Sequence, residues 1–86
     1  MKIKDGYIIK SVAGAKMILP VCNPYFKSVI TVNDTGEFLF ELMKTQKTVD
    51  ELVDAMLLEF EVDSATAKAD VIKFIESLRQ AELLDE

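Results

Sequence analysis

The sequence contains no histidine and only one cysteine, Cys22. Histidine is the most common general base and the most common zinc ligand, so its absence removes the usual means of acid–base and zinc chemistry. A single cysteine forms neither an intrachain disulfide nor a multi-cysteine metal site, and no histidine or basic helix end lies near it to favour a thiolate. We therefore expect no catalytic residues, no metal site and no cofactor.

Glycine and long apolar runs are also scarce. The three glycines are isolated from one another, so no glycine-rich loop is available to hold a phosphate group. The longest apolar runs span a few residues, as at 17–19, whereas a bilayer-spanning helix needs roughly 20. The N-terminus lacks the apolar core of a signal peptide. These absences predict a cytoplasmic protein without a membrane segment.

The length of 86 residues suits one domain, residues 1–86, because two cores need more chain. Half of the residues are apolar, which predicts a folded chain. Charge is divided unevenly. Residues 1–33 hold five lysines and one aspartate, a net charge of +4, whereas residues 34–86 hold five basic and fourteen acidic residues, a net charge of −9. A chain of this balance repels nucleic-acid phosphates.

The first part of the chain is rich in β-branched and aromatic residues, which predicts strands at 6–12, 16–21 and 28–32. From Asn33 the apolar spacing becomes helical. We expect a first helix ending near Lys44 or Thr45, a second begun by the capping box of Thr48 and Glu51, and a third from Ser64, taken as its cap, to about Ala81. Residues 83–84 should fold back onto the end. The expected fold is α+β, three antiparallel strands followed by three helices, similar to a winged helix-turn-helix.

The clustered carboxylates at 50–63 are best interpreted as a solvated helix face, because the spacing of a calcium loop is missing. A winged-helix DNA-binding regulator is the alternative function. Lys68, Lys73 and Arg79 on the third helix favour it, but the acidic second helix opposes it. The third strand is the other candidate site, because 28–32 contains neither charge nor proline to block pairing at an exposed edge. Composition leaves open whether a helix or loop covers that edge.

Several segments, which together cover nearly the whole chain, carry a resemblance to a known family. Residues 29–42, VITVNDTGEFLFEL, resemble the PqqD-family signature of a hydrophobic strand, Leu-Asn-Glu-Thr-Gly, an aromatic residue and Leu. Residues 48–53, TVDELV, resemble its second helix, and residues 70–84 are similar to its third helix and Ala-Gly-Leu-Leu ending. This chain has Glu82 where the family has glycine. Because that change removes a residue free to adopt positive φ, we expect the last helix to run on or end differently.

The resemblance implies a recognition element for ribosomally made, modified peptides, without catalysis. In that family the leader of a precursor peptide adds as a strand beside the third strand, and its apolar side chains rest against the third helix. Here the implied edge is Ser28, Val29, Ile30, Thr31 and Val32. The implied groove wall is Val71, Phe74, Ile75 and Leu78. The implied rim is Lys27, Lys68, Ile72 and Arg79.

The resemblance also implies two partners, a precursor peptide and a modifying enzyme, often a radical S-adenosylmethionine protein. The lysine-rich sheet suggests an acidic leader. An open edge also allows a homodimer. The sequence names neither the peptide nor the product, and pyrroloquinoline quinone synthesis is one pathway among several.

Overall fold

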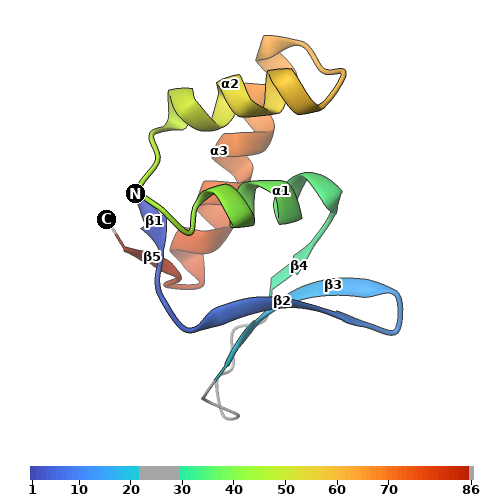
Figure 1. Ribbon diagram of the computed structural model, residues 1–86, viewed down its shortest axis with the longest axis vertical. Coiled ribbons are helices and arrows are strands. Elements are labelled where there is room, and N and C mark those ends of the chain that lie inside the picture. The colour runs from blue at the N-terminus through green and yellow to red at the C-terminus, as the bar shows by residue number, and fades with distance from the viewer. Residues whose placement is uncertain (22–29, 86) are drawn as a thin grey trace.

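The computed structural model describes residues 1–21 and 30–85, which form a small sheet on one side of three helices (Figure 1). Its elements are, in chain order, β1 (Lys2–Ile3), β2 (Tyr7–Val12), β3 (Ala15–Pro20), β4 (Ile30–Val32), α1 (Asp34–Leu42), α2 (Val49–Glu59), α3 (Ser64–Gln80) and β5 (Leu84–Asp85). The predicted α+β fold, with strands before helices, is confirmed.

The main sheet has the order β2-β3-β4, with both neighbouring pairs antiparallel. Ala13 and Gly14 form a two-residue loop in which both residues have positive φ, 52° and 84°. Two successive positive φ values match the right-handed twist of a hairpin, so Val12 and Ala15 pair directly. The turn is therefore one residue shorter than the three residues left between the predicted strands at 6–12 and 16–21.

A second, two-stranded sheet joins the ends of the described chain. Antiparallel pairing of β1 with β5 sets Lys2 opposite Asp85 and Ile3 opposite Leu84. The sequence did not predict β1, but the expected return of residues 83–84 is confirmed, because Leu83 and Leu84 are both buried.

Side-chain caps begin the helices. Asn33 Oδ1 accepts the Gly36 N–H at α1, and the predicted capping box of Thr48 and Glu51 is present at α2, with both reciprocal bonds. The Thr48 backbone N–H chiefly lowers the pKa of Glu51. The predicted cap of α3 is wrong by one residue. The cap is Asp63, whose carboxylate accepts the Thr66 N–H at 2.7 Å. A carboxylate is favoured over a hydroxyl here because its negative charge lies at the positive end of the helix.

Two helix ends differ from the expectation. The first helix, α1, ends at Leu42, two residues before the earlier of its predicted ends. At the end of α3, Glu82 itself adopts the left-handed conformation, with φ of 60°. The Glu82 N–H donates to the Arg79 carbonyl and the Leu83 N–H to the Leu78 carbonyl, at 3.1 and 2.9 Å. This pattern closes a helix in the way that glycine usually does, so the expectation of a different end is wrong.

The core lies between the helices and the inner face of the sheet. Ile18 from β3 is 1% exposed, and it packs in the same cluster as residues of all three helices. One stripe of α3 is buried in this cluster. Its members are Ala67, Val71, Phe74, Ile75 and Leu78.

Candidate functional site

The strand β4 is an edge of the main sheet. β3 lies on one side of it, and within residues 1–21 and 30–85 no strand pairs with its other side. The predicted edge also included Ser28 and Val29, and Lys27 was predicted for the rim. These three positions lie outside the described residues.

The register shows which backbone groups of β4 point to the open side. The Val21 N–H donates to the Gly6 carbonyl at 2.7 Å, which makes these two residues a hydrogen-bonded pair. Bonded and non-bonded pairs alternate along an antiparallel ladder. Leu19 and Met17, two and four residues before Val21, therefore bond to β2, opposite Ile8 and Lys10.

The remaining β3 residues direct their backbone groups to β4. Ile18 is opposite Ile30, and Lys16 is opposite Val32, so these are the bonded pairs. Thr31 lies between them, and its N–H and C=O consequently point away from β3. This residue thus offers a donor and an acceptor at the open edge.

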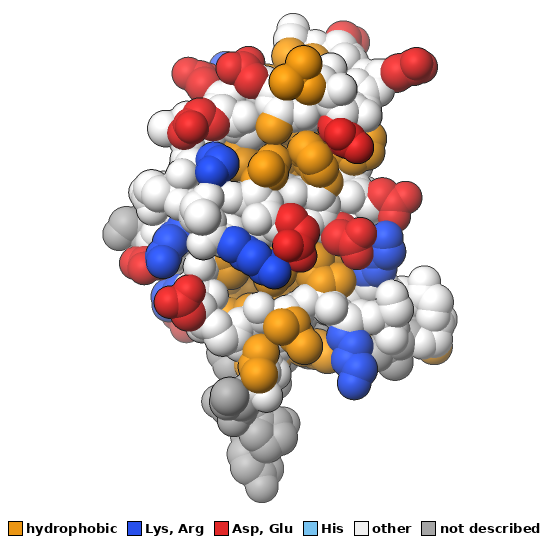
Figure 2. Space-filling model, viewed as in Figure 1, with side chains coloured by type: hydrophobic (Ala, Val, Ile, Leu, Met, Phe, Trp, Pro, Cys, Tyr) orange, Lys and Arg blue, Asp and Glu red, His pale blue; other side chains and the backbone are white. Residues whose placement is uncertain are grey.

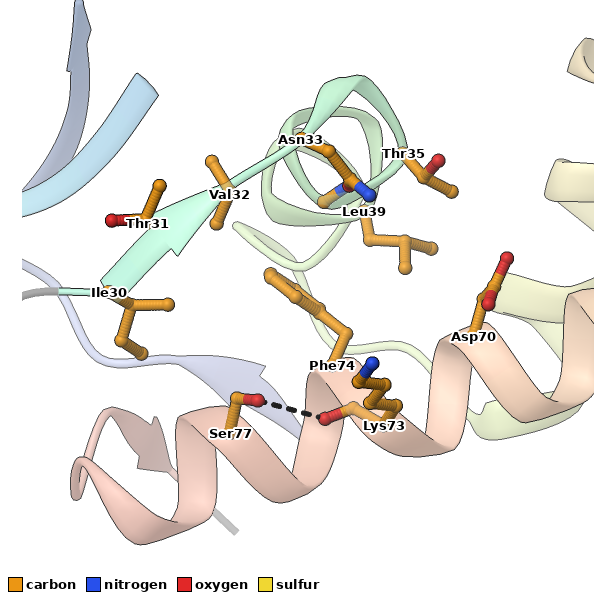
Figure 3. Close-up of a pocket in the computed structure, with 11 residues that line it drawn as sticks. Ile30, Thr31, Val32, Asn33, Thr35, Leu39, Asp70, Lys73, Phe74 and Ser77 are labelled. Carbon is orange, nitrogen blue, oxygen red and sulfur yellow. Dashed lines mark hydrogen bonds between the residues drawn. The ribbon is translucent and has the colours of Figure 1, made fainter. Parts of the chain in front are cut away.

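A hollow of about 420 Å³ lies beside this edge, between β4, α1 and α3 (Figure 3). We call it the β4–α3 hollow. Its apolar lining residues are Ile30, Val32, Leu39 and Phe74, and its other lining residues are Thr31, Asn33, Thr35, Gly36, Asp70, Lys73 and Ser77. An exposed donor–acceptor edge thus adjoins a partly apolar hollow, as the binding of an extended peptide requires.

Some residues predicted for the site come together in the hollow, namely Ile30, Thr31, Val32 and Phe74. The other predicted wall residues do not line it. Ile75 is 5% exposed, and Val71 and Leu78 are fully buried in the core. The predicted rim residues do not line the hollow either, because Lys68, Ile72 and Arg79 lie on exposed faces of α3. Arg79 pairs with Glu76 at 3.1 Å.

Most of the polar lining was not predicted from the sequence. Asp70, Lys73 and Ser77 lie on the same side of α3 as Phe74, at intervals of three and four residues. That spacing was a usable signal. Asn33, Thr35, Gly36 and Leu39 gave no comparable signal, because their place in the hollow depends on how α1 packs against β4.

An ion pair fixes α1 beside β4. Lys16 on β3 donates to Asp34 and Glu37 in the first turn of α1, at 2.7 and 3.3 Å. The bond to Asp34 is the main cause that raises the pKa of Lys16, and the same bond lowers the pKa of Asp34. Lys16 is thus already paired with carboxylates of its own chain. Figure 2 shows that the charged side chains over α2 are mainly acidic and lie beside apolar ones.

Two further properties bear on function. Among the described residues, no group of three or more histidine, cysteine or carboxylate side chains is placed to hold a metal ion. None of the helices in that part of the chain has the length and apolar character needed to cross a membrane. Cys22 lies outside the described residues.

A three-stranded sheet with an open edge beside a helix-lined hollow defines a small α+β module of the winged helix-turn-helix type. The chain belongs to the PqqD family, since the family model described as Coenzyme PQQ synthesis protein D (PqqD) matches residues 21–84. Among solved structures it is similar to TbiB1 in complex with the TbiA(beta) leader peptide. The TM-score is 0.74 and the identity 26%, over 99% of this chain and 95% of TbiB1. The comparison with curated proteins gives no match.

Proposed function

We propose that this protein is a non-catalytic recognition element that binds the leader of a ribosomally synthesised precursor peptide. The leader adds as a fourth strand beside β4 and is presented to a separate modifying enzyme. The observation that carries the proposal is the outward-facing N–H and C=O of Thr31 at the mouth of the β4–α3 hollow. The likeness to TbiB1, a protein solved with a leader peptide, supports it.

The binding energy in this proposal has two sources. Each backbone hydrogen bond to the edge contributes roughly 0.5–1.5 kcal/mol. An apolar leader side chain that leaves water for the hollow contributes about 1.5–3 kcal/mol when it is fully buried. Backbone bonding is insensitive to sequence, so the side chains in the hollow decide which leader binds.

The partner enzyme in this proposal is a radical S-adenosylmethionine protein. Holding both the leader and the enzyme raises the local concentration of substrate at the enzyme. We propose that this occurs in the cytoplasm, with residues 1–86 acting as one domain. The family description agrees with pyrroloquinoline quinone synthesis as one such pathway. A homodimer formed through β4 would compete with the leader for the same edge.

The direct test is fluorescence anisotropy with a labelled leader peptide, encoded by a short reading frame next to the gene. We expect a Kd in the micromolar range or below at about 0.15 M salt, where exposed charges interact only over roughly 8 Å. Labelled duplex DNA is the matched control and should bind only weakly. Tight, salt-sensitive binding of DNA without binding of the peptide would instead support the winged-helix regulator.

A further inference from the structure

Asp70 on α3 is a half-buried carboxylate that lines the β4–α3 hollow. Some carboxylates of this chain are engaged, as Asp63 is by a helix cap and Glu76 by Arg79, and others, such as Asp54 and Glu59, lie on exposed faces. Asp70 has neither a hydrogen bond nor an ion pair within the described part of the chain, and Lys73 lies beyond ion-pairing distance. An acceptor in such a place is available to a ligand.

The hollow has two chemically different ends. Figure 3 shows Asp70 at the end formed by Thr35 and Leu39, whereas Ser77 lies at the end near Ile30. The Ser77 hydroxyl already donates to the Lys73 carbonyl at 3.0 Å. The Thr35 end therefore offers a free charged acceptor, and the Ile30 end is mainly apolar.

The register of an added strand follows from Thr31. In an antiparallel pair, one ligand residue, which we call the pairing residue, makes both hydrogen bonds to Thr31. Its side chain points to the same face as that of Thr31, away from the inner face on which Ile30 and Val32 lie. The ligand residues on either side of the pairing residue therefore point inward, over the hollow. The preceding residue lies across from Val32, and the following residue lies across from Ile30.

We infer that Asp70 determines specificity at the position before the pairing residue, where it favours lysine or arginine and disfavours aspartate and glutamate. The inference rests on the proposed function. A lysine or arginine stem packs against Val32 and Leu39 while its cationic tip reaches Asp70. Lys73 does not cancel this effect, because its exposed, flexible ammonium can turn to solvent. Across from Ile30, beside Phe74, an apolar side chain is favoured.

The probe is a set of binders selected from a displayed library of random peptides and then synthesised. Only binders that lose affinity for the Thr31→Pro variant are kept, because these use the β4 edge. Methylation of each peptide nitrogen in turn then identifies the pairing residue, whose N–H bonds to the Thr31 carbonyl. The preceding residue is next replaced by lysine, norleucine or glutamate, and Kd is measured by anisotropy.

We expect the lysine peptide to bind about three- to tenfold more tightly than the norleucine peptide, and the glutamate peptide to bind least. Asp70→Asn should remove the preference for lysine, and Asp70→Lys should reverse the order. Lys73→Gln, the matched change in the same lining, should retain the preference. Equal affinities for the three peptides, or a preference unchanged in Asp70→Asn, would overturn the inference alone. A library without binders sensitive to Thr31→Pro would overturn the proposed function with it.

Discussion

Lys16 on β3 and Asp34 on α1 are joined by a 2.7 Å hydrogen bond that connects the sheet to the first turn of a helix. Val32, the residue opposite Lys16, ends β4 just before that turn. The bond therefore holds α1 over the end of β4, where Asn33 and Thr35 line the hollow. The Asp34 side chain is 85% exposed and that of Lys16 is 31% exposed, so the expected role of the bond is to position the helix, with a small contribution to stability.

Acid should destabilise this protein through a few identified carboxylates. The Lys16 ammonium lowers the pKa of Asp34, and backbone N–H groups at helix caps lower the pKa values of Glu51 and Asp63. A lowered folded-state pKa contributes stability above the unfolded-state pKa, and that stability is lost as pH falls through the folded-state value. Lys16, whose pKa is raised, contributes below its ordinary value of 10.5 and loses its contribution as pH rises through the raised value.

The corresponding measurement is the melting temperature as a function of pH. We expect a plateau in the neutral range and a decline below about pH 4, near the ordinary pKa of a carboxyl group. Asp63→Asn retains an acceptor at the cap of α3, so it should reduce the acid-induced decline while preserving the helix. Asp54→Asn, on the exposed face of α2, is the control and should leave the decline unchanged. Identical pH profiles for both variants would contradict the assignment to Asp63.

Proline substitutions should separate the two sides of β4. Thr31→Pro removes an N–H that points to the open edge, so the free energy of unfolding should fall by no more than about 1 kcal/mol. Leader binding should weaken at least tenfold. Ile30→Pro removes an N–H bonded to β3 and should clearly lower stability. Ile30→Ala is the control that measures the loss of packing alone.

Urea denaturation and peptide anisotropy on the same samples decide between these outcomes. A Thr31→Pro variant that binds the leader like the parent would show that β4 is not the docking edge. A Thr31→Pro variant that unfolds as readily as Ile30→Pro would show that the two sides of the strand have been assigned in the wrong order.

The sequence predicted the elements well where a repeating pattern exists. The capping box of Thr48 and Glu51 and the apolar stripe of α3 depend on neighbours within a few residues, so they are visible in the sequence. The two-residue strand β1 is too short to have a period, and it forms only because β5 returns beside it. The Thr31 N–H and C=O point outward because of the pairing register, first between β2 and β3 and then between β3 and β4. Similarly, the position of Asp70 opposite Thr35 depends on the packing of two helices.

Substitutions in α3 should separate its contribution to stability from its contribution to leader binding. Leu78 is fully buried, so Leu78→Ala should lower the free energy of unfolding by about 2–5 kcal/mol. The molecules that remain folded should bind the leader with unchanged Kd. Phe74 is 9% exposed and lines the hollow, so Phe74→Leu should weaken leader binding severalfold while costing less stability than Leu78→Ala. Titrations well below each melting temperature, beside urea denaturation, test both effects. Unchanged binding by Phe74→Leu would remove Phe74 from the proposed site.

Glu82 gives the most direct stability prediction, because its side chain is exposed and its backbone is strained. With φ of 60°, it occupies the left-handed region, where a Cβ atom costs roughly 1–2 kcal/mol. Glu82→Gly removes that cost but increases the freedom of the unfolded chain, so the expected net gain is about 0.5–1 kcal/mol. Glu82→Ala removes the charge but retains Cβ, and it should show little of the gain. If urea denaturation showed the same gain in the free energy of unfolding for both variants, loss of the Glu82 charge would be the cause of the gain. A gain confined to glycine would show that the cost comes from the Cβ atom at positive φ.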